Sequence, residues 1–276
     1  PQAPVDWKIV EGQNIPKTVV AGPDGIPTVT VQVEHDTITV TPDQPKNPSD
    51  KLPDGKNYPS GVGENDLNQT ISRKITINVP NKPAQVINQK ADFTRSATID
   101  LVNHEITYGD WKLNDNSLNH VDVPVVPGYT ASQTTVDGIT DPTVNTKLSD
   151  ITVDYTANEQ GQVVNYVDPS GKTVKSDTVP GHTGVIVDIT VNVPDHYILV
   201  PGQTVPRHVT LTDNNNPITI QVQPKIDNIT DPAQLNKTIS RTITINVPGQ
   251  KPQVINQSAN FSRTGTHNEV TGEDNF

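Results

Sequence analysis

One phrase of the sequence occurs twice, and this repetition restricts the possible folds more than any other feature. Residues 67–98 read LNQTISRKITINVPNKPAQVINQKADFTRSAT, and residues 235–266 read LNKTISRTITINVPGQKPQVINQSANFSRTGT. Similarity at a fixed spacing over a whole strand-turn-strand unit is the signature of a repeat protein. Because the second copy stops near the C-terminus, we expect the chain to be part of a longer array of such units.

Copies of a second repeated unit lie before and after residues 67–98 in the sequence. Residues 7–16 read WKIVEGQNIP and residues 27–33 read PTVTVQV, and similar text recurs as YILVPGQTVP at 197–206 and PITIQV at 217–222. The spacing between these copies is 190 residues at first and 189 after a one-residue slip. Residues 1–40 are therefore predicted to be the C-terminal part of a module whose complete copy occupies residues 158–224.

Two segments between the repeats are predicted to be linkers. Residues 41–66 are dense in Pro, Gly, Asp, Asn and Lys and carry no periodic apolar residue, which predicts a solvated, partly polyproline-II segment. Its counterpart, residues 225–234, is shorter. The two repeat spacings of 189 and 168 residues differ by 21, so the chain between the two kinds of repeat is 21 residues shorter in the second copy, and we expect folded modules of constant length and linkers of variable length.

The composition favours several small β modules over one deep core. The chain of 276 residues is 32% hydrophobic, with 25 prolines and 17 glycines, and it is rich in Thr, Val and Asn. In residues 67–157, Ile71, Ile75 and Ile77 share one face of a predicted strand. No segment there has clear helical spacing, so we predict an all-β module, and residues 235–276 would begin a second one. In residues 158–224, the DPSG turn at 168–171 predicts a β-hairpin.

The charge and the missing residue types exclude several classes of protein. The formal net charge of −11 disfavours binding to nucleic acid and to anionic bilayers. The absence of cysteine excludes disulfides and thiolate metal sites. No apolar window is long enough for a membrane span. We expect an exported surface protein whose signal and anchor lie outside this sequence.

No arrangement of polar residues predicts catalysis or metal binding. The seven histidines lack the spacing of metal ligands, and we interpret them as surface or turn residues at 35, 104, 120, 182, 196, 208 and 267. The possible acid pairs Asp100 with Glu105 and Asp137 with Asp141 are interpreted as turn carboxylates. The Asp/Asn clusters at 114–116 and 213–216 lack a calcium-loop pattern and are interpreted as tight turns. We therefore predict no enzyme, no cofactor and no metal.

Aromatic residues are the natural candidates for contacts to sugars, because sugar rings stack on exposed aromatic faces. We interpret most of them as core or corner residues of small modules, and they are Trp7, Tyr108, Trp111, Tyr129, Tyr155, Tyr166 and Tyr197. Trp111, beside a Gly-Asp pair, is the first to test. The sequence does not identify the binding residues.

Several of these motifs, taken in order, resemble the mucus-binding protein (MucBP/Mub) repeats of lactobacillar surface adhesins. The complete module is similar to a MucBP module through VNYVD at 164–168, GKT at 171–173, Asp177, Gly181 and Gly184. Residues 67–156 are similar to the module that follows MucBP in those repeats, here called the partner module. The matching motifs are ISRKIT at 71–76, Gln89, FTR at 93–95, YGDW at 108–111 and PGYT at 127–130.

The resemblance implies a β-grasp, ubiquitin-like fold for the MucBP-like module and an elongated all-β fold for the partner module. It also implies a cell-wall-anchored Gram-positive parent protein, a monomeric elongated array, and adhesion to host mucin glycoproteins through weak multivalent contacts. Some members of the family bind immunoglobulins. The sequence departs from the family at 185–200, VIVDITVNVPDHYILV, where a helix-compatible segment is usual and His196 replaces a glycine.

Two alternatives remain open from the sequence. The modules could act as a structural stalk that spaces a distal adhesive head from the cell wall. A Lys–Asn isopeptide bond could replace the missing disulfides as a staple, although no pattern selects a pair.

Overall fold

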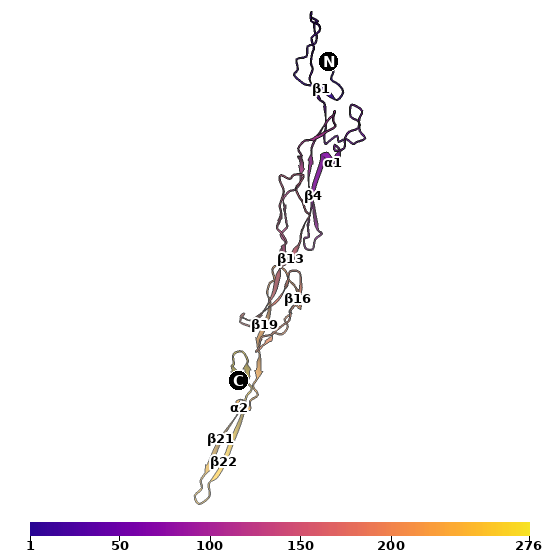
Figure 1. Ribbon diagram of the computed structural model, residues 1–276. Coiled ribbons are helices and arrows are strands. Elements are labelled where there is room, and N and C mark those ends of the chain that lie inside the picture. The colour runs from indigo at the N-terminus through magenta and orange to yellow at the C-terminus, as the bar shows by residue number, and fades with distance from the viewer. The chain divides into compact units, whose positions relative to one another are not determined.

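The computed structural model describes all residues from Pro1 to Phe276, and its contacts divide the chain into two units (Figure 1). The first unit holds Pro1–Val126 and Ala131–Thr156, and the second holds Pro127–Thr130 and Ala157–Phe276. Strands β1 to β24 form nearly all of the regular structure, with two helices of four residues each. The prediction of a mainly β chain is confirmed. Neither helix has the length and apolar character needed to cross a membrane.

The first unit begins with a short ribbon that leads into a three-stranded sheet. β1 (Trp7–Ile9) pairs antiparallel with β2 (Val33–His35). One residue later the chain enters β3 (Thr37–Val40), which joins β6 (Ala97–Asp100) and β7 (Ile106–Tyr108) in the order β3-β6-β7. This sheet therefore connects the end of the partial MucBP-like copy directly to the partner module.

A long hairpin dominates the partner module. β4 (Asn68–Ile77) and β5 (Gln85–Thr94) pair over ten residues, flanked by β8 (Lys112–Asn116) and β12 (Ile151–Val153) in the order β12-β4-β5-β8. Ile75 and Ile77 of β4 are fully buried and Ile71 is partly buried, which confirms their predicted common face. The remaining short strands are β9 (Val121–Asp122), β10 (Tyr129–Ala131), β11 (Thr135–Val136) and β13 (Tyr155–Ala157).

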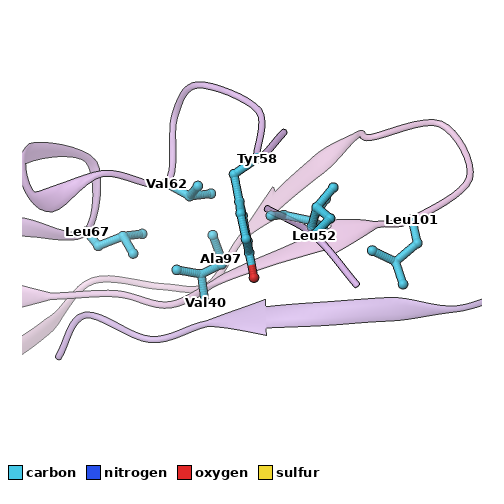
Figure 2. Packing of buried hydrophobic residues seen from close by; sticks show 8 residues of the cluster. Val40, Leu52, Tyr58, Val62, Leu67, Ala97 and Leu101 are labelled. Atoms are coloured by element: carbon cyan, nitrogen blue, oxygen red, sulfur yellow. The ribbon is translucent and has the colours of Figure 1, made fainter. Parts of the chain in front are cut away.

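The segment 41–66 is folded, so the prediction of a solvated linker there is wrong. Leu52, Tyr58 and Val62 are 3%, 6% and 0% exposed, and they pack with Val40 and other apolar residues of the three-stranded sheet. Figure 2 shows their side chains converging above this sheet. The apolar residues follow no helix or strand period because local turns, not regular elements, bring them together. One such turn is closed by the hydrogen bond from the Leu52 amide to the Lys56 carbonyl (2.8 Å).

The second unit contains a mixed four-stranded sheet. Its order is β15-β14-β19-β17, formed by β14 (Glu159–Val167), β15 (Thr173–His182), β17 (Tyr197–Leu199) and β19 (Ile218–Pro224). β14 runs antiparallel to β15, which confirms the predicted hairpin, and parallel to β19. β16 (Ile186–Asp188) pairs with β18 (His208–Thr210) beside it. No helix occurs between residues 158 and 224, in agreement with the β-branched sequence there.

The C-terminal part of the second unit repeats the hairpin of the first unit. β21 (Asn236–Ile245) and β22 (Gln253–Ser262) pair from Asn236 with Ser262 to Ile245 with Gln253, the same register as β4 and β5. The short linker predicted at 225–234 is also wrong, because it contains β20 (Ile226–Asn228) and most of α2 (Pro232–Leu235). α2 matches α1 (Glu64–Leu67), and β20 pairs with β23 (Thr266–Asn268), which pairs with β24 (Asp274–Asn275).

Candidate functional site

The second unit carries a surface groove in its MucBP-like part. The groove lies between two segments, 188–191 and 199–208, and its volume is about 710 Å³. Its lining combines apolar side chains, including Ile189 and Val205, with a few polar groups, which is the usual character of a ligand site. The two segments are separated in sequence, so the groove exists only in the folded module.

The polar groups of the groove gather where β16 and β18 pair. Asp188 lies opposite His208 in the register, and His208 Nδ1 lies 2.7 Å from Asp188 Oδ1. The backbone carbonyl of the preceding residue, Arg207, fixes the groove edge by accepting a hydrogen bond from the Ile189 amide (2.8 Å). Arg207 and His208 are both exposed. An exposed guanidinium beside an imidazole–carboxylate pair offers donors and acceptors to hydroxyl-rich or anionic ligands.

A glutamine holds the loop that forms the far wall of the groove. Gln203 Nε2 donates to the carbonyls of Val200 (3.0 Å) and Gln221 (2.6 Å), and Gln203 Oε1 accepts from the Gln221 amide (2.8 Å). The loop is therefore tied to β19 by two hydrogen bonds of one side chain, and the third, to Val200, closes the loop on itself. Such anchoring presents the groove wall in one conformation before any ligand binds.

The partial N-terminal copy has the same three hydrogen bonds, made by Gln13. Gln13 Nε2 donates to the carbonyls of Val10 (2.9 Å) and Gln32 (2.6 Å), and Gln13 Oε1 accepts from the Gln32 amide (2.7 Å). Thr18 and Lys17 occupy the positions of His208 and Arg207, so a cation remains while the imidazole is lost. The wall of the groove is a shared feature of the two copies, and its polar edge differs between them.

Most of the aromatic residues hold the fold together, as predicted. Tyr166 is fully buried and its hydroxyl accepts a hydrogen bond from the Asn192 amide (2.6 Å). The Tyr155 hydroxyl donates to the Pro124 carbonyl (2.5 Å). Trp7 contacts the His35 ring edge-to-face, with the ring centroids 4.6 Å apart. None of these aromatic rings lines the groove.

Trp111, the first residue that the sequence suggested for a test, lies in the first unit and is only partly exposed. The guanidinium carbon of Arg95 lies 3.7 Å from the ring centre of Tyr108 and 4.5 Å from that of Trp111, so the arginine stacks on both rings. Arg95 Nε also donates to the Asp66 carbonyl (2.8 Å). This cluster fastens α1 to the sheet.

The second copy of the partner module has the same stacking of an arginine on an aromatic ring. The guanidinium of Arg263 lies 3.5 Å from the ring centre of Phe276, and Arg263 Nε donates to the Gln234 carbonyl (3.1 Å). Because the arrangement recurs with a phenylalanine, its common role is structural. Trp111 is consequently a weaker candidate for sugar binding than the groove.

The histidines and acidic residues named from the sequence occupy different kinds of position in the structure. No group of three or more His, Asp or Glu side chains is arranged to hold a metal ion. Asp100 lies at a turn, where Oδ1 accepts from the Val102 amide (2.9 Å), and the hydrogen bond from His35 lowers its pKa. Residues 213–216 form a turn, but residues 114–116 lie in β8, so their interpretation as a tight turn is wrong.

The stapling hypothesis gains no support from the contact between Lys51 and Asn57. Lys51 Nζ contacts Asn57 Oδ1, but both side chains are exposed.

Comparison with known proteins finds matches to mucus-binding domains and repeats. A family model described as the Muc B2-like domain matches residues 62–159. The solved MucBP domain of the adhesion protein from Pediococcus pentosaceus is 31% identical, covering 32% of this chain and 98% of that chain, with a TM-score of 0.24.

Two solved mucus-binding repeats also match, at lower identity. The type 2 repeat of the mucus binding protein MUB from Lactobacillus reuteri is 17% identical, with a TM-score of 0.27. Mub-RV is 19% identical, with a TM-score of 0.33. Each match covers 55% of this chain and 76% of the other. No curated protein sequence matches the chain.

Proposed function

Because the chain belongs to the family of mucus-binding repeats, we propose that it is a non-catalytic adhesin segment that binds host mucin glycoproteins. The groove between residues 188 and 208 makes the contact. The observation that carries this assignment is the position of the groove within the MucBP-like module, where apolar walls and an exposed Arg207 meet the Asp188–His208 pair.

The chemistry of the groove suits a saccharide better than an apolar ligand. Sugar rings present apolar C–H faces and hydroxyl groups, which match an apolar floor beside a polar edge. Arg207 could in addition pair with the acidic groups of mucin glycans, because guanidinium groups bind carboxylate and sulfate well. The groove is open to solvent. An open groove encloses little of a ligand, so it favours weak contacts to many different glycans.

The sheet order β15-β14-β19-β17, with β14 and β19 parallel, supports a β-grasp module that lacks the usual helix. His196, which replaces the family's glycine, has a φ of 66°, in the left-handed region that glycine adopts most easily. This backbone conformation is one that the glycine usual in the family would adopt without strain.

Repetition would raise the strength of such weak binding. Tandem modules on one chain convert later contacts into intramolecular ones, so avidity can exceed the affinity of one groove by a factor of about 10²–10⁴. We place the protein on the outside of a Gram-positive cell, attached to the cell wall through a parent protein. This location follows from the family and fits a chain without cysteine.

A pair of substitutions tests the groove directly. The variant Arg207→Ala with His208→Ala should lower binding of the whole chain to immobilised mucin at physiological salt. Lys172→Ala is a matched control, because Lys172 is an exposed cation of the same module outside the groove. Equal binding by the double variant, the control and the unmodified chain would contradict the proposal.

A structural stalk is the second candidate, favoured by the continuous hydrogen bonding between modules described below. Replacing the repeats of a parent adhesin by an unrelated spacer of equal reach separates the two functions. Loss of mucin adhesion supports binding by the repeats, and full adhesion supports a stalk. Immunoglobulin binding, known in the family, is tested by competition on the same mucin surface.

A further inference from the structure

The first junction between a MucBP-like module and its partner module consists of one residue that is bonded on both sides. Asp36 separates β2 from β3. Its amide donates to the Asp6 carbonyl (2.9 Å) on the MucBP-like side, and its carbonyl accepts from the Leu101 amide (2.9 Å) on the partner side. The backbone thus passes from one sheet to the next without an unbonded residue.

The second junction has the same construction. Lys225 separates β19 from β20. Its amide donates to the His196 carbonyl (2.8 Å), and its carbonyl accepts from the Glu269 amide (3.0 Å). The repeated pattern shows that this connection belongs to the repeat itself. Fully bonded extended backbone has little freedom to bend, because bending would break hydrogen bonds on both sides.

We propose that each MucBP-like module is joined stiffly to the partner module that follows it, and that the segment 41–63 makes the first junction stiffer than the second. The consequence is that a groove has a fixed orientation relative to its partner module. This inference concerns the backbone junctions and does not depend on what the groove binds.

A histidine–carboxylate contact crosses each junction, but from different positions. At the first, His35 Nδ1 lies 2.7 Å from Asp100 Oδ2. At the second, the corresponding residues are Pro224 and Asn268, which cannot form this pair. There His196 Nδ1 lies 3.2 Å from Glu269 Oε2. The same kind of contact therefore arises twice from non-equivalent residues, which indicates that it serves the junction.

The segment 41–63 adds a further contact at the first junction only. Lys56 Nζ lies 3.4 Å from Asp6 Oδ2 across the junction and 2.7 Å from Asp54 Oδ2 within the segment. The second copy lacks 21 of these residues, because the repeat spacing falls from 189 to 168. A covering segment thus contacts both modules at the first junction and is missing at the second.

The residues that the segment 41–63 helps to bury differ between the two copies. Ile99 and Leu101, which the segment helps to bury, correspond to His267 and Glu269 in the second copy. Polar residues occupy these positions where no segment covers them. The segment 41–63 is therefore an integral part of the first junction and its core.

Distances between spin labels across each junction test the proposal in the full chain. The absence of cysteine means that two introduced cysteines carry the only labels. Exposed sites are Lys8→Cys with Val86→Cys across the first junction and Lys172→Cys with Ser258→Cys across the second. The pair Val86→Cys and Thr140→Cys lies within one module. Its distance distribution gives the width expected when no junction separates the two labels.

We expect the distance distribution across the first junction to be as narrow as the one within a module. The distribution across the second junction should be somewhat broader. Lys56→Ala with Asp100→Asn should broaden the first distribution alone, and Glu269→Gln the second alone. Lys82→Ala, an exposed lysine in the β4–β5 turn, is the control and should change neither.

Removing residues 42–62 tests the role of the segment. Combined with Ile99→His and Leu101→Glu, the deletion gives the first junction the chain length of the second and its residues at these two positions, and it avoids leaving these two apolar side chains uncovered. The first distribution should then widen to that of the second. Broad distributions in the unmodified chain would overturn stiff joining, and equal widths at both junctions would overturn the role of the segment 41–63.

Discussion

The hydroxyl of Tyr108 donates a hydrogen bond to the Gly61 carbonyl (2.7 Å), joining residues 47 positions apart. The equivalent of Tyr108 in the second copy is Phe276, which has no hydroxyl, and that copy lacks the segment to which Gly61 belongs. The hydroxyl is present where it has a partner and absent where it has none.

Tyr108→Phe should therefore destabilise the first partner module by about 1 kcal/mol, the usual net value of one hydrogen bond. The measurement is chemical denaturation followed by a probe in the first unit. Phe276→Tyr is the matched control and should bring no gain, because no carbonyl of a segment like 41–63 is available there. An equal effect of both substitutions would contradict this account.

Tyr58→Ala should lower the stability of the first partner module by about 3–5 kcal/mol, because it removes a large buried side chain. A solvated linker would tolerate the same change within about 0.5 kcal/mol. Thermal unfolding distinguishes the two outcomes. Lys82→Ala, exposed in a turn, serves as a control for a change at the surface.

Arg73 and Arg241 occupy equivalent positions in opposite environments. Arg73 is 8% exposed, with Nε bonded to Gln89 Oε1 (2.8 Å) and a terminal nitrogen bonded to the Asp137 carbonyl (2.7 Å). Arg241 makes the corresponding bond to Gln257 but is exposed. Arg73→Ala should cost about 1–3 kcal/mol or more, whereas Arg241→Ala should stay within about 0.5 kcal/mol. Denaturation of both variants side by side is the measurement, and a larger loss for Arg241→Ala would refute the comparison.

Asp100 should make the stability of the first unit sensitive to acid. The hydrogen bond from His35 lowers the pKa of this carboxyl below its usual value of 3.8. A lowered folded-state pKa contributes stability above the unfolded pKa, and this contribution is lost as the pH falls through the lower, folded value. Asp100→Asn should therefore flatten the stability profile below about pH 4. Unfolding followed across the acid range is the measurement, and an unchanged profile in the Asp100→Asn variant would contradict this account.

Appending a copy of residues 109–157 after Phe276 should bury the open face of the β21–β22 hairpin. Phe93 is 3% exposed beneath Leu118 and neighbouring residues of that segment, whereas the equivalent Phe261 is 56% exposed. The remaining face residues are the same in both copies. Amide hydrogen exchange of β21 and β22 should slow markedly in the extended chain. A scrambled version of the appended residues controls for added length, and equal protection by both would contradict the prediction.

Much of the fold follows from the sequence because repetition and strand periodicity are local patterns. The doubled phrase predicted a hairpin that occurs twice with the same register. The DPSG turn predicted the β14–β15 hairpin. Residues 41–66 were misread because Leu52, Tyr58 and Val62 follow no period. A signal was nevertheless present, since Ile99 and Leu101 become His267 and Glu269 in the copy without the segment.

The candidate site depended on tertiary structure. Arg207 and His208 form no motif with Asp188 in the sequence, and only the pairing of β16 with β18 brings the histidine to the carboxylate. Trp111 stood out as an aromatic residue, but its partial burial against Arg95 depends on strands distant in sequence. The sequence alone determined the repeated long hairpin and the β14–β15 hairpin, because backbone preference and side-chain alternation act between near neighbours. Tertiary structure decided which apolar residues are covered and which polar ones converge, because burial depends on contacts between distant parts of the chain.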